Sequence, residues 1–208
     1  MLQPEDLPKD PELEASLQEE AHAGDPIAQC QLSHMYAKGL YVEKDEVKFL
    51  QWARLAAEQG YPEGFWLMGL AYGGGRGVPH SDMEEAAKWF ERAAHKSHPQ
   101  AAQQLGRLYA AGNGVLKSPL NAYKWMMWGK IMAEMMDKTA DEKEGPHWTV
   151  EEVLETIDED IQSLKEEMTE AQFEQADKVW GEFLADMVAN LEVEKGENPQ
   201  ADLFDDKT

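Results

Sequence analysis

The segment GDPIAQCQLSHMYAKGLYVEKDEVKFLQWARLAAEQ at residues 24–59 recurs as GYPEGFWLMGLAYGGGRGVPHSDMEEAAKWFERAAHK at 60–96. It recurs again, almost without gaps, as SHPQAAQQLGRLYAAGNGVLKSPLNAYKWMMWGKIM from residue 97. Matching tyrosines stand 36 and then 37 residues apart, at Tyr36, Tyr72 and Tyr109. Matching tryptophans stand 37 and then 36 residues apart, at Trp52, Trp89 and Trp125. A period of this length is typical of repeat architectures, so these three copies decide the fold.

Each copy has the pattern of two helices joined by a short loop. In the first half, apolar and small residues recur at helical spacing, as in Ala101, Leu105, Leu108 and Tyr109. This run ends at a glycine that can adopt positive φ, namely Gly39, Gly75 or Gly112. A second helix is expected to begin at good N-cap residues near Asp45, Ser81 and Ser118, with Pro119 as the first helical residue in the third copy.

A single helix pair cannot bury its own apolar face, so the pairs must stack on one another. We therefore predict an all-α fold, a right-handed α/α solenoid of three helix hairpins with helical caps at both ends. The predicted organisation is an acidic N-terminal segment with a capping helix (1–23), three repeats (24–59, 60–96 and 97–137), a connector (138–148), a C-terminal capping helical hairpin (149–191) and a disordered tail (192–208). Capping boxes at Thr149 to Glu152 and Thr169 to Gln172 mark the starts of the last two helices.

Charge is unevenly distributed along the chain. The net charge of -22 comes from the two ends, because residues 24–137 carry 12 acidic and 12 basic residues. Residues 1–23 carry 7 acids and 1 base, and residues 138–208 carry 22 acids and 6 bases. Nucleic acids and anionic lipids bind through Lys and Arg, so the composition argues against both as partners.

The location of the protein is predicted from what the sequence lacks. The most apolar segment, 123–136, is interrupted by Lys124, Lys130 and Glu134, which argues against membrane insertion. The start MLQPEDLPKD has no basic and apolar signal pattern, so a cytoplasmic location is expected, or a periplasmic or secreted one if a signal peptide preceded Met1. The single cysteine, Cys30, excludes an internal disulfide and is expected to be a small buried hydrophobe.

The pattern G-D-x-x-A-x-x-x-L-G-x-x-Y-x-x-G-x-G-V followed by A-x-x-W-x-x-x-A-A-x-x-G resembles the Sel-one-like repeat, a longer relative of the tetratricopeptide repeat. The second copy fits best, through Gly69, Tyr72, Gly75, Gly77, Val78, Ala87, Trp89, Ala93 and Ala94. The resemblance covers roughly residues 15–190, because MTEAQFEQADKVW is similar to the helix that closes many bacterial members. Departures are Tyr41 in place of the second loop glycine, and Gly129 with Lys130 in place of the alanine pair.

Catalytic and cofactor motifs are weak. The glycines of GGGRG at 73–77 lack the P-loop lysine and are already explained by the repeat, and His95 and His98 lie where a helix should stop. Acidic clusters fall on the polar faces of amphipathic helices. The sequence therefore predicts neither an enzyme nor a metal or cofactor site.

The resemblance implies scaffold or adaptor work, with a partner protein or peptide bound on the concave face of the repeats. Counting offsets from Ala28, Gly64 and Ala101, the residues predicted to face the groove are Gln31, His34, Lys38, Trp66, Leu67, Leu70, Gln103, Gln104 and Arg107. Packing between repeats is an equal alternative for Trp66 and Leu70. The methionines of the third unit could form an adaptable groove, although core packing is favoured for Met126, Met127, Met132, Met135 and Met136.

Two other functions stay open. Some members of this family are linked to binding or hydrolysis of β-lactam and cell-wall compounds, but those members are rich in cysteine and this chain has one. Self-association through the acidic terminal helices is a structural possibility. The sequence identifies no particular partner.

Overall fold

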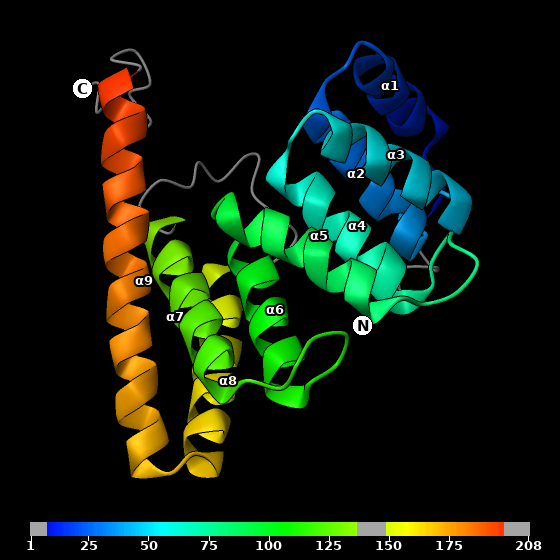
Figure 1. Cartoon of the computed structure of the whole chain (residues 1–208). Helices are drawn as coiled ribbons and strands as arrows, with labels where there is room; N and C mark the ends of the chain where they lie inside the picture. The colour runs from blue at the N-terminus through cyan, green and yellow to red at the C-terminus, as the bar shows by residue number, and fades with distance from the viewer. Residues whose placement is uncertain (1–7, 137–148, 198–208) are drawn as a thin grey trace.

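The structure, a computed structural model, describes residues 8–136 and 149–197, and these segments contain helices and no strands. Helix α1 (Pro11–His22) precedes three helix pairs, and α8 (Val150–Glu167) and α9 (Glu170–Glu197) follow them (Figure 1). The pairs are α2 (Pro26–Lys38) with α3 (Glu46–Glu58), α4 (Pro62–Gly74) with α5 (Met83–His95), and α6 (Pro99–Ala111) with α7 (Pro119–Met136). The architecture confirms an all-α repeat solenoid.

The helix ends follow the predicted chemistry with one correction. The first helix of each pair ends at a glycine in the left-handed region, and φ is 71° at Gly39, 64° at Gly75 and 73° at Gly112. The second helices of repeats one and three begin at Asp45 and Ser118 as predicted. In repeat two the N-cap is Asp82 and not Ser81, because the Asp82 carboxylate accepts the backbone N–H of Glu85 at 3.0 Å.

The second loop glycine fixes the contact between successive repeats. A Cβ atom added at Gly77 would lie 2.3 Å from the carbonyl oxygen of Glu46, so only glycine allows this approach. Tyr41 occupies the equivalent position in the first repeat and adopts the same left-handed backbone, with φ of 59°. Its carbonyl accepts the backbone N–H of Asp10 at 2.8 Å. Helix α1 therefore takes the place of a preceding second helix, as the sequence predicted.

The core lies between helices of successive pairs and is lined by small residues at the crossings. Ala56 and Ala93 are fully buried, and Gly129 replaces them in the third repeat. A Cβ atom at Gly129 would lie 2.9 Å from the carbonyl oxygen of Pro99, so α7 approaches α6 especially closely. Glycine at this position thus allows the close approach of the two helices within the third repeat.

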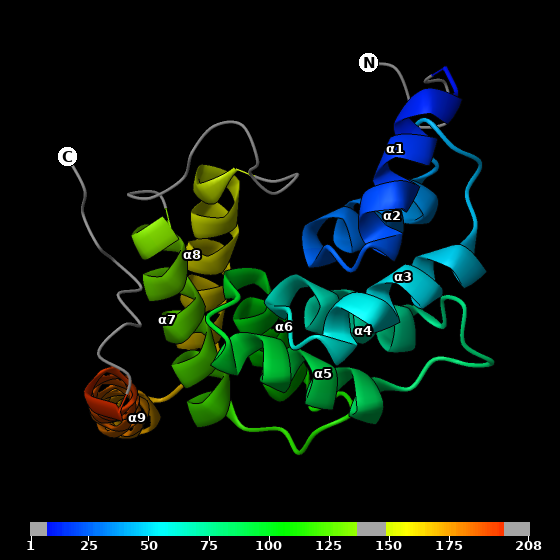
Figure 2. The same ribbon diagram turned by 90° about the horizontal axis from the view of Figure 1, so that it is seen from above.

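The two C-terminal helices cap the third repeat, as predicted, and lie on either side of α7. Both start at the predicted capping boxes, but α8 packs against α6 and α7 while α9 packs against α7, so that α7 lies between them (Figures 1 and 2). Each helix buries its apolar stripe on the third repeat and not on the other helix. Helix α9 also continues to Glu197, past the predicted start of the tail at 192, since EVEKGE is rich in helix-forming residues. The predicted connector 138–148 and residues 198–208 lie outside the described residues.

Candidate functional site

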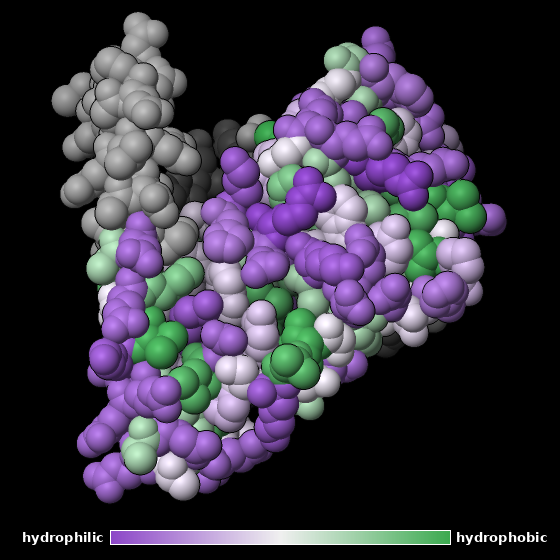
Figure 3. Space-filling view, viewed as in Figure 1, coloured by the Kyte–Doolittle hydropathy of each residue, from purple (hydrophilic) through white to green (hydrophobic). Residues whose placement is uncertain are grey.

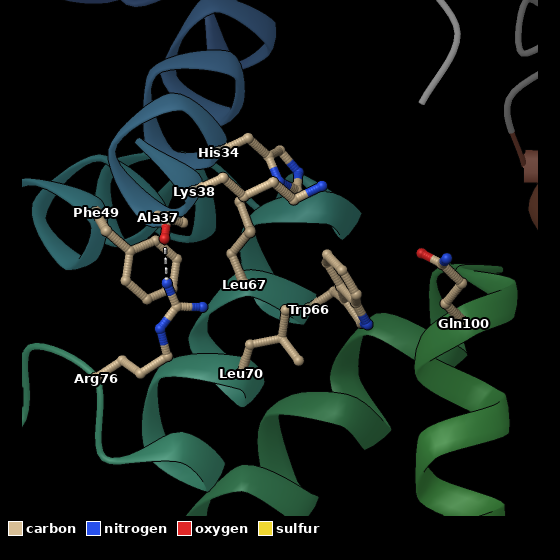
Figure 4. Close-up of a pocket in the computed structure, with 9 residues that line it drawn as sticks. All are labelled: His34, Ala37, Lys38, Phe49, Trp66, Leu67, Leu70, Arg76 and Gln100. Atoms are coloured by element: carbon tan, nitrogen blue, oxygen red, sulfur yellow. Dashed lines mark hydrogen bonds between the residues drawn. The ribbon is translucent and has the colours of Figure 1, made fainter. Parts of the chain in front are cut away.

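A groove of about 200 Å³ opens along the first helices of the repeats (Figure 4). Helix α2 contributes the side opposite α6, and α4 forms the floor between them. The lining residues are His34, Ala37, Lys38, Phe49, Trp66, Leu67, Leu70, Arg76 and Gln100. Five of these, His34, Lys38, Trp66, Leu67 and Leu70, belong to the predicted partner-binding set. The structure therefore brings together the predicted residues of repeats one and two.

A hydrogen-bonded cluster beneath the groove connects all three repeats. Glu63 of α4 accepts hydrogen bonds from His34 Nε2 and from His98 Nε2, each at 2.7 Å. Nδ1 of His98 accepts the backbone N–H of Ala101 at 3.2 Å, which places the ring proton on Nε2. The cluster fixes the relative positions of α2, α4 and the start of α6.

This cluster holds Glu63 in its charged form. Burial would raise the pKa of the Glu63 carboxyl, but the hydrogen bonds from His34 and His98 outweigh burial and keep that pKa far below its ordinary value. The carboxylate is mostly covered, with 19% of its side chain exposed. A charge this well paired orients the two imidazoles and does not present itself to a ligand.

Trp66 is positioned by the two imidazoles. Its ring stacks on His98 with a centroid distance of 5.5 Å and an interplanar angle of 15°, and it lies 6.0 Å from the His34 ring. The indole is therefore held in one orientation at the side of the groove. An aromatic residue that is already ordered loses little conformational entropy when a partner binds against it.

Two polar atoms at the groove have no hydrogen-bond partner among the described residues. Nε1 of Trp66 is a buried donor, and Oε1 of Gln100 is a buried acceptor. Figure 4 shows both side chains at the same end of the groove. Buried polar groups are normally hydrogen-bonded, so this donor and this acceptor are two groups that a ligand at this end of the groove could satisfy.

The charges at the other end of the groove are basic. The Arg76 guanidinium donates to the carbonyl oxygen of Ala37 at 2.8 Å and lies 4.6 Å over the Phe49 ring. Lys38 is exposed and forms no ion pair with any residue that the structure describes. One fixed and one free cation therefore flank the apolar wall made by Leu70 and Trp66.

The third repeat does not contribute to the groove as predicted. Gln103 is buried and donates to Thr156 at 3.1 Å and to Asp160 at 2.7 Å, and Arg107 donates to Asp160 at 2.7 Å. Helix α8 thus covers this part of the concave row. Leu67 borders the groove but is buried, with 1% exposed, because it packs in the core. Gln31 and Gln104 are half-buried and do not line the groove.

Several groove residues escaped the sequence prediction. Gln100 and Glu63 lie at the start of their helices, before the offsets from Gly64 and Ala101 begin, and Arg76 lies in a loop. The signal for Gln100 and Glu63 was their position directly after Pro99 and Pro62, in the first turn of α6 and α4. Nothing in the sequence pairs Arg76 with Phe49, because that contact joins two repeats.

Other predictions can be compared with the same structure. Cys30 is buried, as expected, and burial raises the pKa of its thiol. Met126 and Met132 lie in the core, while Met135 is 44% exposed. Within residues 8–136 and 149–197 there is no group of three acidic, histidine or cysteine residues that could hold a metal ion. No helix in those ranges has the length and apolarity to cross a bilayer.

The fold defines the class of this protein, a helix-pair solenoid with a groove along its first helices. The Sel1 repeat family matches residues 26–61, 66–98 and 99–126. The chain belongs to the Sel1-like repeat proteins. The resemblance found in the sequence is thereby confirmed.

Two solved structures extend this comparison. The Sel1 repeat protein from Oxalobacter formigenes is 30% identical with a TM-score of 0.52, and the match covers 64% of this chain and 56% of that one. The protein c5321, a protective antigen of uropathogenic Escherichia coli with an SLR fold, is 31% identical with a TM-score of 0.54, and the match covers 78% and 35%. This chain thus spans about half and about a third of these relatives. A search of curated proteins found no match.

Proposed function

We propose that the protein is a scaffold that binds a short segment of a partner protein in the groove between α2, α4 and α6. The observation that carries this proposal is the pair of unpaired atoms, Trp66 Nε1 and Gln100 Oε1, at one end of the groove. A peptide group offers a carbonyl to the indole N–H and an N–H to the amide oxygen. A peptide backbone therefore offers the kind of partner that each atom lacks.

The rest of the groove favours an apolar and acidic segment. Trp66 and Leu70 provide apolar surface, and Lys38 provides an unpaired cation. The third repeat gives an internal example, since its concave row binds α8 through a carboxylate, Asp160, held by Gln103 and Arg107. We expect the partner segment to place an apolar side chain against Trp66 and a carboxylate near Lys38.

A scaffold also agrees with the family, because the Sel1-like repeat fold is typically non-enzymatic. The comparisons give no support to the alternative, in which the protein binds or hydrolyses a small cell-wall or β-lactam compound. Function in this fold depends on the surface of particular repeats, so the groove and not the fold supports the proposal.

The proposal is tested by selecting peptides from a random display library on the full chain and measuring their affinities by fluorescence polarisation. Trp66→Phe keeps an aromatic ring but removes the indole N–H, and we expect it to weaken binding of the selected peptides about tenfold, the effect of one buried hydrogen bond. Lys38→Glu should weaken the acidic peptides by a similar factor and leave the fold unchanged, because Lys38 is exposed.

Leu116→Arg is the control for these variants. Leu116 is 90% exposed and does not line the groove, so this substitution should leave the affinities unchanged. Selected peptides that bind the Trp66→Phe and Lys38→Glu variants as tightly as the original chain would place the binding surface elsewhere.

A further inference from the structure

A second apolar surface lies on the outer side of the first repeat, over α3. Val47 is 59% exposed and Leu55 is 42% exposed, beside the half-buried ring of Trp52. They border an open depression of about 550 Å³ lined by His22, Val47, Leu50, Gln51, Trp52, Arg54 and Leu55. Figure 3 shows hydrophobic surface over α3 within a largely hydrophilic face. Large exposed apolar side chains gathered in one place mark interaction sites.

The repeat symmetry shows what the same surface does elsewhere in the chain. The matching positions of the third repeat, 73 residues later, are His95, Leu120, Tyr123, Lys124, Trp125, Met127 and Trp128. The His22 and Trp52 rings meet edge to face at 5.1 Å and 84°, and the His95 and Trp125 rings meet at 5.1 Å and 86°. The two surfaces are therefore built on the same frame.

In the third repeat this surface is covered by α9. Phe183 of α9 lies with its ring centroid 5.4 Å from Trp125 and 5.7 Å from Trp128, and Phe173 lies 5.5 Å from Tyr123. Trp125 and Trp128 are each only 2% exposed as a result. Where the outer surface of a repeat is apolar and aromatic, an amphipathic helix lies on it.

The second repeat provides the opposite case. Its matching positions include Glu84, Lys88 and Arg92, which are charged. The Arg92 guanidinium lies 4.5 Å over the Trp89 ring, and Lys88 pairs with Glu84 at 3.2 Å. These side chains cover the aromatic ring and face solvent, and α9 packs against α7 and not against this repeat. The first repeat keeps the apolar residues of the third, and among the described residues no helix lies over them.

We infer that the outer surface of α3 binds an amphipathic helix of a partner protein, with an aromatic side chain inserted beside Trp52. Arg54 replaces Met127 at the border of this surface, is exposed, and forms no ion pair among the described residues. The partner helix therefore carries an acidic residue next to its apolar stripe, as α9 does with Glu182 beside Phe183. This site is separate from the concave groove and does not depend on the function proposed for it.

The experiment uses the full chain and a fluorescein-labelled peptide with the sequence of residues 170–186 of α9, which contains Phe173 and Phe183. Fluorescence polarisation should show binding with a Kd of tens of micromolar, since a short isolated helix is only partly formed in water. The same peptide with Phe183→Ala should bind at least tenfold more weakly. Absence of binding by the original peptide at millimolar protein would overturn the inference.

The matched variant is Val47→Glu with Leu55→Arg, which installs the residues of the second repeat at two exposed positions. We expect it to keep the helical circular dichroism spectrum and to weaken peptide binding at least tenfold, whereas the control Leu116→Arg leaves binding unchanged. Peptide binding that survives in the double variant would mean exchange with α9 on α7 and would overturn the assignment to α3.

Sedimentation of the full chain separates a partner protein from a second copy. We expect a monomer up to about 100 μM, well above the affinities at which a specific dimer of this kind forms. If the chain forms a dimer and the Val47→Glu and Leu55→Arg variant does not, this surface binds a second copy of the chain. That result would overturn the inference of a different partner.

Discussion

The first and third repeats share one backbone plan but differ in what covers them. The third is enclosed, with α8 on its concave side and α9 on its outer side. In the part of the chain that the structure describes, the first is open on both sides, at the groove with Lys38 and at the depression with Trp52. The comparison shows that a solenoid gains binding surface where its terminal helices leave a repeat uncovered.

The largest expected effect comes from comparing Trp125 with Trp52, which occupy the same position in their repeats. Trp125→Ala should lower the free energy of unfolding by about 4 kcal/mol, because truncating a fully buried tryptophan leaves a cavity. Trp52→Ala should cost about 2 kcal/mol, because no helix lies over the half-buried ring. Urea denaturation followed by circular dichroism measures both, and equal losses would show that α9 adds no cover.

The stability of the repeats around the groove depends instead on buried hydrogen bonds. Glu63→Gln should cost about 2 kcal/mol at neutral pH, because an amide cannot accept from both His34 and His98. The folded-state pKa of Glu63 lies below its ordinary value of 4.5, so its stabilisation is complete above that pH and is lost as the pH falls below it.

Denaturation midpoints measured between pH 7 and pH 3 should therefore fall less steeply for Glu63→Gln than for the original chain. Glu84→Gln is the control, since 74% of the Glu84 side chain is exposed. If the two variants have the same pH dependence, Glu63 is not held in its charged form by the histidines.

A smaller effect is expected where α8 meets the concave row. Arg107 and Asp160 form a partly exposed ion pair at 2.7 Å, so a double-mutant cycle with Arg107→Ala and Asp160→Ala should give a coupling of about 1 kcal/mol. Hydrogen exchange of the α8 amides should quicken in both single variants. Unchanged exchange would mean that apolar packing alone holds α8 in place.

The smallest effect is expected at Lys38, in the open part of the same row. Lys38→Ala should change the free energy of unfolding by less than about 0.5 kcal/mol, because this exposed side chain has no ion pair among the described residues. Thermal denaturation is sufficient to measure this. A loss as large as that of Arg107→Ala would mean that the groove is closed in solution.

The repeat fold could be predicted from the sequence because its signals are local and recur. Spacing between Trp52, Trp89 and Trp125 gave the period, and the loop glycines gave the helix ends. Tyr41 shows the strength of this register, since it adopts the left-handed backbone of the glycine that it replaces. Such features depend on neighbours within one repeat or on the next repeat.

The binding surface was only partly predictable, because it depends on contacts between distant segments. Gln103 and Arg107 are polar residues of the kind expected in an open groove. Only the path of the chain beyond residue 148 brings Asp160 to them. The arrangement of α8 and α9 on either side of α7 was not predicted for a similar reason. Two amphipathic stripes joined by a tight turn can pack on each other or on a third helix, and the sequence does not distinguish these arrangements.

The turn between α8 and α9 links the two covers of the third repeat. Only Met168 and Thr169 separate the helices, and α7 lies between them, so neither helix can leave its place without straining the attachment of the other. A molecule that displaced α8 from the concave side would loosen α9 on the opposite side, and the reverse holds with equal free energy. Occupancy on one side of the third repeat is thereby communicated to the other.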